Sequence, residues 1–236
     1  MNPIIIVPDE HGRGLWKNGL KYFNENPESK MIFLGDYLDP YTRYEGITHE
    51  DAYNNLLEVL EFARNNRERV ILLRGNHDEW NYDENRECCR HDYHNMKRNR
   101  KLFKDNEDLF QFAYKEGDYL FTHAGVCTGW LLQNNLTHIN EDNIVDYLNG
   151  NPKTLWQIGE SRGGLQDWGS PLWCCWIGDW THNECKNPFN LTQCIGHTRI
   201  GKQNFPSSMK NKNVYMFDVQ NCFLLDTETG EINLLS

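Results

Sequence analysis

Five short polar segments, each following an apolar run, carry residue types that bind transition metals. In chain order they are Asp9-Glu10-His11, Gly35-Asp36-Tyr37-Leu38-Asp39, Gly75-Asn76-His77-Asp78, Thr122-His123-Ala124-Gly125 and Gly196-His197-Thr198-Arg199. Mixed carboxylate, imidazole and amide-carbonyl ligands suit Mn, Fe, Zn or Ni better than the all-oxygen sites preferred by Mg and Ca. Each segment alone is weak, because such short patterns are common in turns. Together they predict a hydrolytic centre that holds two metal ions.

Single residues within these segments indicate distinct chemical roles. Asp9 and His11 can place a carboxylate and an imidazole on one cation, and the two oxygens of Asp36 can bridge two cations. Asn76 offers a neutral oxygen ligand, and His77 beside it offers an acid–base group. The segment around residues 75–78 is therefore the most specific of the five.

The apolar runs before the first three segments are typical of short strands buried on both faces. They cover residues 4–7, 31–34 and 69–73. Helical spacing separates them, over residues 15–23 and over residues 49–64, where Thr48 and Asp51 predict a capping box. Strands alternating with helices predict β-α-β units and a largely parallel sheet. Ligands bind at the carboxyl ends of such strands, where the first three polar segments fall.

The rest of the chain mixes strands with a long irregular stretch. Residues 83–108 are highly charged and are expected to be partly helical on the surface, with the histidines at 91 and 94 exposed. Further strands are predicted at residues 109–114, 119–122, 192–195, 214–219, 223–226 and 232–235, with a short helix at 140–148. Residues 150–190, rich in Gly, Trp, Asn and Pro, predict a long insert with little regular structure. Because the polar segments run from residue 9 to residue 199, we expect one domain over residues 1–236.

Composition narrows the class of protein. The net charge of −10 argues against general nucleic-acid binding and against an anionic membrane surface. No apolar stretch approaches the roughly 20 residues of a membrane span, and the N-terminus lacks the features of a signal peptide, so we expect a cytoplasmic protein. The cluster Trp168, Trp173, Trp176 and Trp180 is expected in the core, with an adenine-binding platform as the alternative.

Eight cysteines are present, and their spacing argues against a structural zinc site. They are Cys88, Cys89, Cys127, Cys174, Cys175, Cys185, Cys194 and Cys222. Two adjacent pairs occur, but no C-x-x-C motif does. In a reducing compartment we expect free thiols, several of them buried, rather than a disulfide framework.

The ordered set of five segments resembles the calcineurin-like metallophosphoesterases. This resemblance implies an α/β fold in which two mixed β-sheets pack as a central sandwich flanked by helices. Many nucleases and phosphodiesterases of the superfamily end their last segment as G-H-x-H. Here Gly196-His197-Thr198-Arg199 is instead similar to the Ser/Thr phosphoprotein phosphatases and the bacterial diadenosine tetraphosphatases.

The resemblance also implies a ligand set and a mechanism. One metal ion is expected on Asp9, His11 and Asp36, and the second on Asp36, Asn76, His123 and His197. Mn²⁺ is the expected ion, with Fe, Zn or Ni as alternatives. A hydroxide bridging the two ions attacks phosphorus in line. His77 then protonates the leaving oxygen, and Asp39 orients its imidazole.

One departure from the phosphoprotein phosphatase pattern concerns phosphate binding. The G-D-x-V-D-R-G motif carries an arginine that grips phosphate, but Pro40 and Tyr41 follow Asp39 here. Five arginines are candidate replacements: Arg13, Arg43, Arg74, Arg162 and Arg199. Arg74 and Arg199 are nearest the polar segments in sequence, and Arg162 can reach in from the insert.

These features lead to one function and two alternatives. The leading hypothesis is a metal-dependent phosphatase that hydrolyses phosphate monoesters. The first alternative is a dinucleoside polyphosphate hydrolase of the diadenosine tetraphosphate type. The second is a non-catalytic scaffold with a metallophosphoesterase fold, which the complete ligand set disfavours. The expected partners are a phosphorylated small molecule, a nucleotide or a phosphoprotein.

Overall fold

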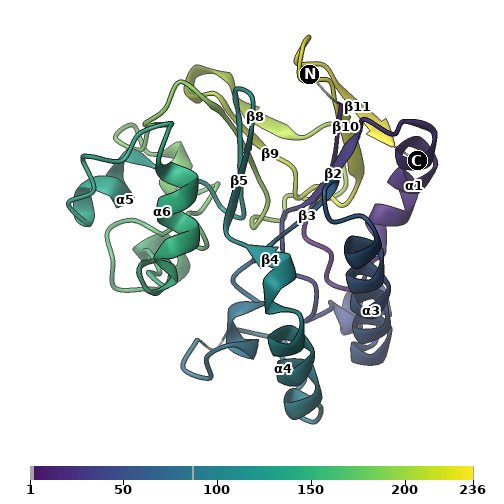
Figure 1. The fold of residues 1–236 in the computed structure, drawn as a ribbon. Helices are drawn as coiled ribbons and strands as arrows, with labels where there is room; N and C mark the ends of the chain where they lie inside the picture. The colour runs from purple at the N-terminus through teal and green to yellow at the C-terminus, as the bar shows by residue number, and fades with distance from the viewer. Residues whose placement is uncertain (1–2, 87, 236) are drawn as a thin grey trace.

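The computed structural model describes residues 3–86 and 88–235, and two mixed β-sheets with flanking helices dominate it (Figure 1). Within those residues the first sheet has six strands in the order β11-β10-β1-β2-β3-β4. They are β1 (Ile4–Val7), β2 (Lys30–Phe33), β3 (Val70–Leu73), β4 (Phe110–Gln111), β10 (Cys222–Leu225) and β11 (Ile232–Leu235). Neighbours from β1 to β4 are parallel, whereas β10 is antiparallel to both β1 and β11.

The second sheet runs in the order β5-β6-β7-β9-β8. Its strands are β5 (Ala113–Glu116), β6 (Tyr119–Thr122), β7 (Thr192–Ile195), β8 (Ser207–Met209) and β9 (Val214–Met216). The central three are parallel, and the outer strands β5 and β8 are antiparallel to their neighbours. This α/β arrangement of two mixed sheets agrees with the fold that the sequence resemblance implied.

The alternation of side chains along β1 shows how the layers are held together. All four of its residues are fully buried, as expected for a strand covered on both faces. Ile4 and Ile6 pack with Phe121 and Phe217 between the two sheets, whereas Ile5 and Val7 face the helices. The first sheet is therefore the middle layer between the second sheet and the helices of the first half of the chain.

Helices cover the outer faces of both sheets (Figure 1). They are α1 (Leu20–Glu25), α2 (Thr42–Glu45), α3 (His49–Asn65), α4 (Met96–Asp105), α5 (Thr128–Gln133) and α6 (Ile144–Gly150). Figure 1 shows α1 and α3 on the opposite side of the molecule from α5 and α6, with α4 below β4. The predicted capping box of α3 is confirmed, since Thr48 Oγ1 accepts from the Asp51 amide and Asp51 Oδ2 accepts from the Thr48 amide. Short 3₁₀ helices occur at Leu15–Gly19, Glu79–Asn81, Glu107–Leu109, Pro152–Leu155, Glu160–Arg162, Asp179–Thr181 and Lys210–Lys212.

One prediction from local sequence is confirmed and another needs correction. Strands β1 to β4 are parallel, as the alternation of strands and helices predicted, and β10 and β11 join the same sheet in antiparallel orientation. The strand predicted at residues 109–114 is divided into β4 in the first sheet and β5 in the second. At the crossover, Asn149 Oδ1 accepts from the amides of Phe112 and Ala113 at 2.8 and 3.1 Å. A distant side chain thus satisfies backbone groups that leave one sheet for the other.

The stretch at 150–190, called the insert below, contains only short 3₁₀ helices and one isolated bridge among its described residues. Trp173, Trp176 and Trp180 are buried in it, whereas Trp168 is half-buried. Gln157 Oε1 accepts from Trp130 Nε1 of α5 at 2.8 Å, which ties the insert to that helix. No helix in the described part of the chain is long and apolar enough to cross a membrane.

Candidate metal centre

The structure brings all six predicted metal ligands to one place, where strands of both sheets end. Three strands of the first sheet deliver Asp9, His11, Asp36 and Asn76, and two strands of the second deliver His123 and His197. Asp36 lies at the middle of this group, with its Oδ2 3.6 Å from His11 Nε2 and 3.6 Å from His123 Nε2. One carboxylate therefore faces two separate sets of ligands.

The Asn76 amide oxygen lies between the two histidines of the second sheet. Asn76 Oδ1 is 2.9 Å from His123 Nε2 and 2.9 Å from His197 Nδ1, and those two nitrogens are 3.2 Å apart. The His197 amide donates to both carboxylate oxygens of Asp9 at 3.0 and 3.1 Å. The centre is thus a tight convergence of oxygen and nitrogen acceptors.

Two backbone carbonyls set the orientation of the imidazoles. Leu38 O lies 2.8 Å from His11 Nδ1, and Leu34 O lies 2.7 Å from His123 Nδ1. Because a carbonyl oxygen only accepts, each Nδ1 carries a proton, and Nε2 is the ring nitrogen left to bind a cation in the centre. Lone pairs that face one another at these distances repel unless a cation lies among them. The donor set therefore fits bound metal ions.

The backbone at the centre adopts conformations that most residues avoid. His11, Asp36, Asp39 and His197 have φ angles of 41°, 57°, 59° and 72°. Left-handed backbone at non-glycine residues is strained, and such strain collects at functional sites. At His11, Asp36 and His197 this backbone lies in the loop that follows a strand and carries a predicted ligand.

At two positions beside the predicted ligands, only glycine leaves room for a neighbouring carboxylate. A Cβ at Gly75 would lie 2.1 Å from Asp36 Oδ1, and one at Gly196 would lie 2.2 Å from Asp9 Oδ1. Any larger residue at these positions displaces a carboxylate. The glycines of the polar segments thus belong to the centre as much as the ligands do.

Asp78 supports the centre through the backbone. Its carboxylate accepts from the amides of Gly75, Asp36 and Tyr37 at 2.7, 2.8 and 3.0 Å. The same carboxylate therefore holds the loops that follow β2 and β3 together. Asp39, and not Asp78, contacts the His77 ring.

The pKa values of the predicted ligands are shifted in directions that suit cation binding. Burial raises the pKa of Asp9 to about 6, whereas burial lowers the pKa of His11 to about 3 and keeps that imidazole neutral. Burial alone would raise the pKa of Asp36, but the imidazoles around it hold that pKa well below its usual value. Desolvation and the Arg162 guanidinium lower the pKa of His197. Neutral imidazoles at His11 and His197, beside an ionised Asp36, are protonation states that suit a bound metal ion.

His77 has a different environment from the ligand histidines. Its Nδ1 is 2.8 Å from Asp39 Oδ2, and its backbone amide donates to Asp36 Oδ1 at 2.9 Å. Burial opposes the charged ring, but Asp36 and Asp39 together raise the pKa of His77 well above its usual value. Burial also works against ionised Asp39, yet contacts with His77 and His91 hold its pKa at about 2. These contacts favour the protonated form of His77, with Nδ1 held by Asp39.

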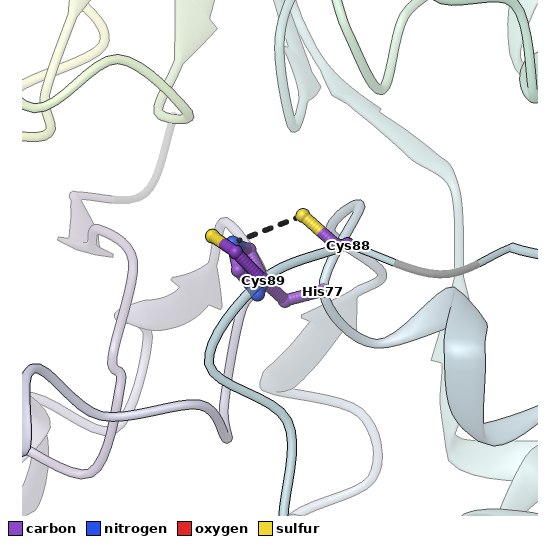
Figure 2. A group of neighbouring side chains, drawn as sticks. All are labelled: His77, Cys88 and Cys89. Atoms are coloured by element: carbon purple, nitrogen blue, oxygen red, sulfur yellow. Dashed lines mark hydrogen bonds between the residues drawn. The ribbon is translucent and has the colours of Figure 1, made fainter.

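The chain at 88–91 covers His77 and was not predicted to join the site. Cys88 Sγ lies 3.4 Å from His77 Nε2, with Cys89 beside the ring (Figure 2). His91 was predicted to be exposed, but it is buried, stacks on Trp80 with ring centroids 4.2 Å apart, and places Nδ1 2.5 Å from Asp39 Oδ2. The charged character of the surrounding sequence hid this contact.

A group of guanidiniums surrounds the half-buried ring of Tyr41. The guanidinium carbons of Arg90, Arg199 and Arg13 lie 3.8, 4.5 and 5.3 Å from the ring centroid. Glu45 pairs with Arg13 and Arg199, each at 2.8 Å. Arg90 Nη2 lies 3.5 Å from His11 Nε2 and 3.4 Å from His77 Nε2. Of the three, Arg90 thus lies closest to the reactive groups.

The other candidate arginines have separate positions. Arg162 reaches from the insert and donates to Thr198 Oγ1 at 2.6 Å, beside His197. Arg74 is held by Glu79 and Glu107 at 3.4 and 3.2 Å, and its guanidinium lies 3.6 Å from the Tyr82 ring centroid. Arg43 is exposed on α2.

Arg90 is the residue that sequence reasoning missed most clearly. Pro40 stands where an arginine is expected, which indicated that another cationic side chain must bind phosphate. The candidates nearest in sequence to the predicted ligands were preferred, and Arg90 is not among them. Arg90 reaches the centre because its chain segment folds back over His77, and its Nε donates to Asp39 O at 3.0 Å. This position of Arg90 depends on tertiary packing, and no local sequence pattern predicts it.

Comparisons with known proteins agree on the type of fold. A family model described as calcineurin-like phosphoesterase matches residues 3–198. No curated protein matches the sequence. A solved structure of a cold-active protein tyrosine phosphatase is similar at a TM-score of 0.60 and 16% identity, covering 100% of this chain and 79% of that chain.

Two further solved structures are similar. A protein serine/threonine phosphatase from Saccharomyces cerevisiae has a TM-score of 0.56 and 15% identity, covering 100% of this chain and 80% of that chain. A candidate diadenosine tetraphosphatase has a TM-score of 0.52 and 12% identity, covering 99% of this chain and 92% of that chain. At these identities the likeness concerns the fold alone.

Proposed function

Since the chain belongs to the calcineurin-like phosphoesterase family and is therefore a phosphoester hydrolase, we propose that it hydrolyses phosphate monoesters with two transition-metal ions. The observation that carries this proposal is the position of Asp36. Its Oδ2 lies 3.6 Å from an imidazole nitrogen on each side, one from each sheet. A carboxylate so placed is suited to join two ions.

The proposed ligand sets divide the centre at Asp36. Asp9, His11 and Asp36 hold one ion, and Asp36, Asn76, His123 and His197 hold the other. Mn²⁺ is the ion we expect, because oxygen ligands and imidazoles are mixed in both sets. When bound, the ions supply Lewis-acid activation of the phosphoryl group and a lowered pKa for the attacking water.

His77 is the proposed proton donor to the leaving oxygen. Its raised pKa keeps a proton on the ring, and Asp39 accepts the Nδ1–H, so that Nε2–H faces the centre. His91 positions Asp39 from the far side. Its Nε2 accepts from the Cys88 amide at 2.8 Å, which leaves the proton on the Nδ1 that faces Asp39.

We assign phosphate binding first to Arg90 and second to Arg162. Arg90 is within 3.5 Å of the two imidazoles on either side of the reacting position, and Arg162 lies beside His197. Arg13 and Arg199 line the same side through Tyr41, but both are partly neutralised by Glu45. Two cationic groups near the centre suit the charge of a phosphate monoester dianion.

The substrate class is tested by comparing three compounds under the same metal loading. Initial rates on a phosphoserine peptide, p-nitrophenyl phosphate and diadenosine tetraphosphate give kcat/KM for each. We expect the two monoesters to be hydrolysed faster. A kcat/KM for diadenosine tetraphosphate about a hundredfold above both monoesters would favour the anhydride hydrolase and contradict the proposal.

The metal mechanism is tested with Asp36→Asn. This change removes the shared carboxylate charge, so we expect lower metal content and loss of activity by at least about 10³-fold. Asp146→Asn, on the exposed face of α6, is the matched control and should retain both. Equal activity of Asp36→Asn and the control would exclude the proposed centre.

A further inference from the structure

Three cysteines from separate parts of the chain meet in the interior, outside the ligand set described above. Cys127 precedes α5, whereas Cys174 and Cys185 belong to the insert. Their sulfur atoms all lie within 4.8 Å of one another, and each residue is at most 1% exposed. Cys194 and Cys222 are equally buried but join no such group among the described residues. The grouping of these three sulfurs is therefore not a general consequence of burying cysteines.

Hydrogen bonds to backbone carbonyls hold the chain segments that carry the three cysteines. Lys186 O accepts from both the amide and the hydroxyl of Thr128, each at 2.8 Å, which holds the segments of Cys127 and Cys185 side by side. The Cys174 amide donates to Ser170 O at 2.8 Å. The meeting of the three sulfurs is thus built into the packing of this region.

Distance and charge both suit a soft cation. Thiolates on one tetrahedral Zn²⁺, at ~2.3 Å from the ion, lie ~3.8 Å from one another, within the limit found here. Hydrogen bonds from Cys174 and Cys185 lower the pKa of Cys127 well below its usual value, while the pKa values of those two thiols are raised. Burial instead raises the pKa of Cys194 and of Cys222 well above the usual value of a thiol. Of these five buried thiols, Cys127 alone favours the thiolate form, whose charge a cation would neutralise.

We propose that Cys127, Cys174 and Cys185 bind a thiophilic metal ion, with Zn²⁺ as the expected ion. Each thiol releases its proton to solvent as its sulfur binds. No fourth Cys, His, Asp or Glu atom joins them in the part of the chain that the structure describes, so water or a backbone oxygen completes the coordination. The spacing of the cysteines argued against a zinc site because no C-x-x-C pair is present, whereas this cluster combines Cys127 with two cysteines that are well separated within the insert.

The ion would tie the insert to the body of the protein. With only short 3₁₀ helices, this segment has few hydrogen-bonded elements of its own. It nevertheless reaches the catalytic centre, since the Trp173 ring lies 5.7 Å from that of His197 and Pro171 O accepts from the Ala124 amide at 2.7 Å. A metal cross-link next to Trp173 would hold this wall of the centre in place.

The test uses the full chain with Asp36→Asn, Cys88→Ser and Cys89→Ser, which weakens metal binding at the catalytic centre and beside His77. After zinc loading and gel filtration, metal analysis by mass spectrometry should find about one zinc ion per chain. Adding Cys174→Ser should lower that content at least about tenfold, whereas adding Cys194→Ser should not. Absence of zinc in the parent, or equal zinc in the two cysteine variants, would overturn the proposal.

If Cys174→Ser does not fold, a spectroscopic measurement on the parent protein tests the same site. The same parent protein loaded with Co²⁺ should show thiolate-to-cobalt charge-transfer absorption in the near ultraviolet, because its catalytic ligands include no sulfur. A cobalt protein without this absorption would contradict the site. So would an intact mass that reveals a disulfide within the cluster, since a disulfide leaves too few thiolates.

Discussion

At the scale of single residues, His77 differs from the other histidines of the centre because two carboxylates face it. Those carboxylates raise its pKa, while burial lowers the pKa of His11 and desolvation lowers that of His197. One type of side chain can thus supply both the proposed neutral ligands and the proposed acid, and the difference comes from the neighbours of each ring.

His77→Gln should remove proton donation without removing a proposed metal ligand. We expect kcat for a phosphoserine peptide to fall by ~10²–10⁴-fold, since an alkoxide leaving group needs a proton. The fall for p-nitrophenyl phosphate should be much smaller, because nitrophenolate leaves without one. Steady-state kinetics on both substrates give the two ratios, and metal analysis checks that the ligands are retained. An equal loss on both substrates would contradict the role of His77 as general acid.

Arg90→Lys tests the residue that sequence reasoning missed. Lysine keeps the charge but loses the planar pair of donors, so we expect KM for p-nitrophenyl phosphate to rise about tenfold, with a smaller change in kcat. The inhibition constant for inorganic phosphate should rise in parallel. Arg67→Lys, in the exposed pair with Asp108, is the control. An unchanged KM and phosphate inhibition constant would remove Arg90 from the phosphate site.

At the scale of elements, the junctions between strands and loops carry the chemistry. Each ligand follows its strand within a few residues, and left-handed backbone at four positions turns the side chains inward. This geometry requires small residues opposite the carboxylates, which Gly75 and Gly196 provide. The loops are therefore held to one shape by contact with the ligands themselves.

Gly196→Ala should disturb the centre from the end of β7. The added Cβ would lie 2.2 Å from Asp9 Oδ1, so the carboxylate must move. We expect a fall of ~10–100-fold in metal affinity, measured by titration with Mn²⁺ and activity as the readout. Gly150→Ala is the matched control, because a Cβ there meets nothing within 4 Å. Comparable affinities in the two variants would show that Asp9 is not held against Gly196 as the structure has it.

Elements with local signals were predictable from the sequence, and those that depend on distant contacts were not. The buried run at Ile4–Val7 and the capping box of α3 are determined within a few residues, and both agree with the structure. The division of β4 from β5 depends on Asn149, whose side chain is far along the chain. Arg90 and the three-cysteine cluster likewise arise from chain segments that pack together only in the folded protein.

At the scale of the whole molecule, the centre joins the two sheets at one edge, while an apolar layer joins them over their faces. Ile6 and Phe121 belong to that layer and are fully buried. At the edge, by contrast, carboxylates and imidazoles from both sheets converge. Apolar packing stabilises the contact over the faces by itself, whereas the cations proposed above would add stability to the contact at the edge.

Metal removal should therefore lower the stability of the entire fold and not only its activity. An ion present at about 100 times its Kd, and bound by the folded state alone, adds ~2.7 kcal/mol to the free energy of unfolding. For a chain of this size, that corresponds to a loss of about 5–10 °C in Tm when Mn²⁺ is withdrawn by a chelator. Calorimetry of the wild type, with and without added Mn²⁺, measures the shift. In Asp36→Asn the shift should shrink to a small fraction of the wild-type value, because the carboxylate shared by both ligand sets has lost its charge. A Tm in the wild type that does not respond to Mn²⁺ would mean that these ligands do not join the two sheets through metal.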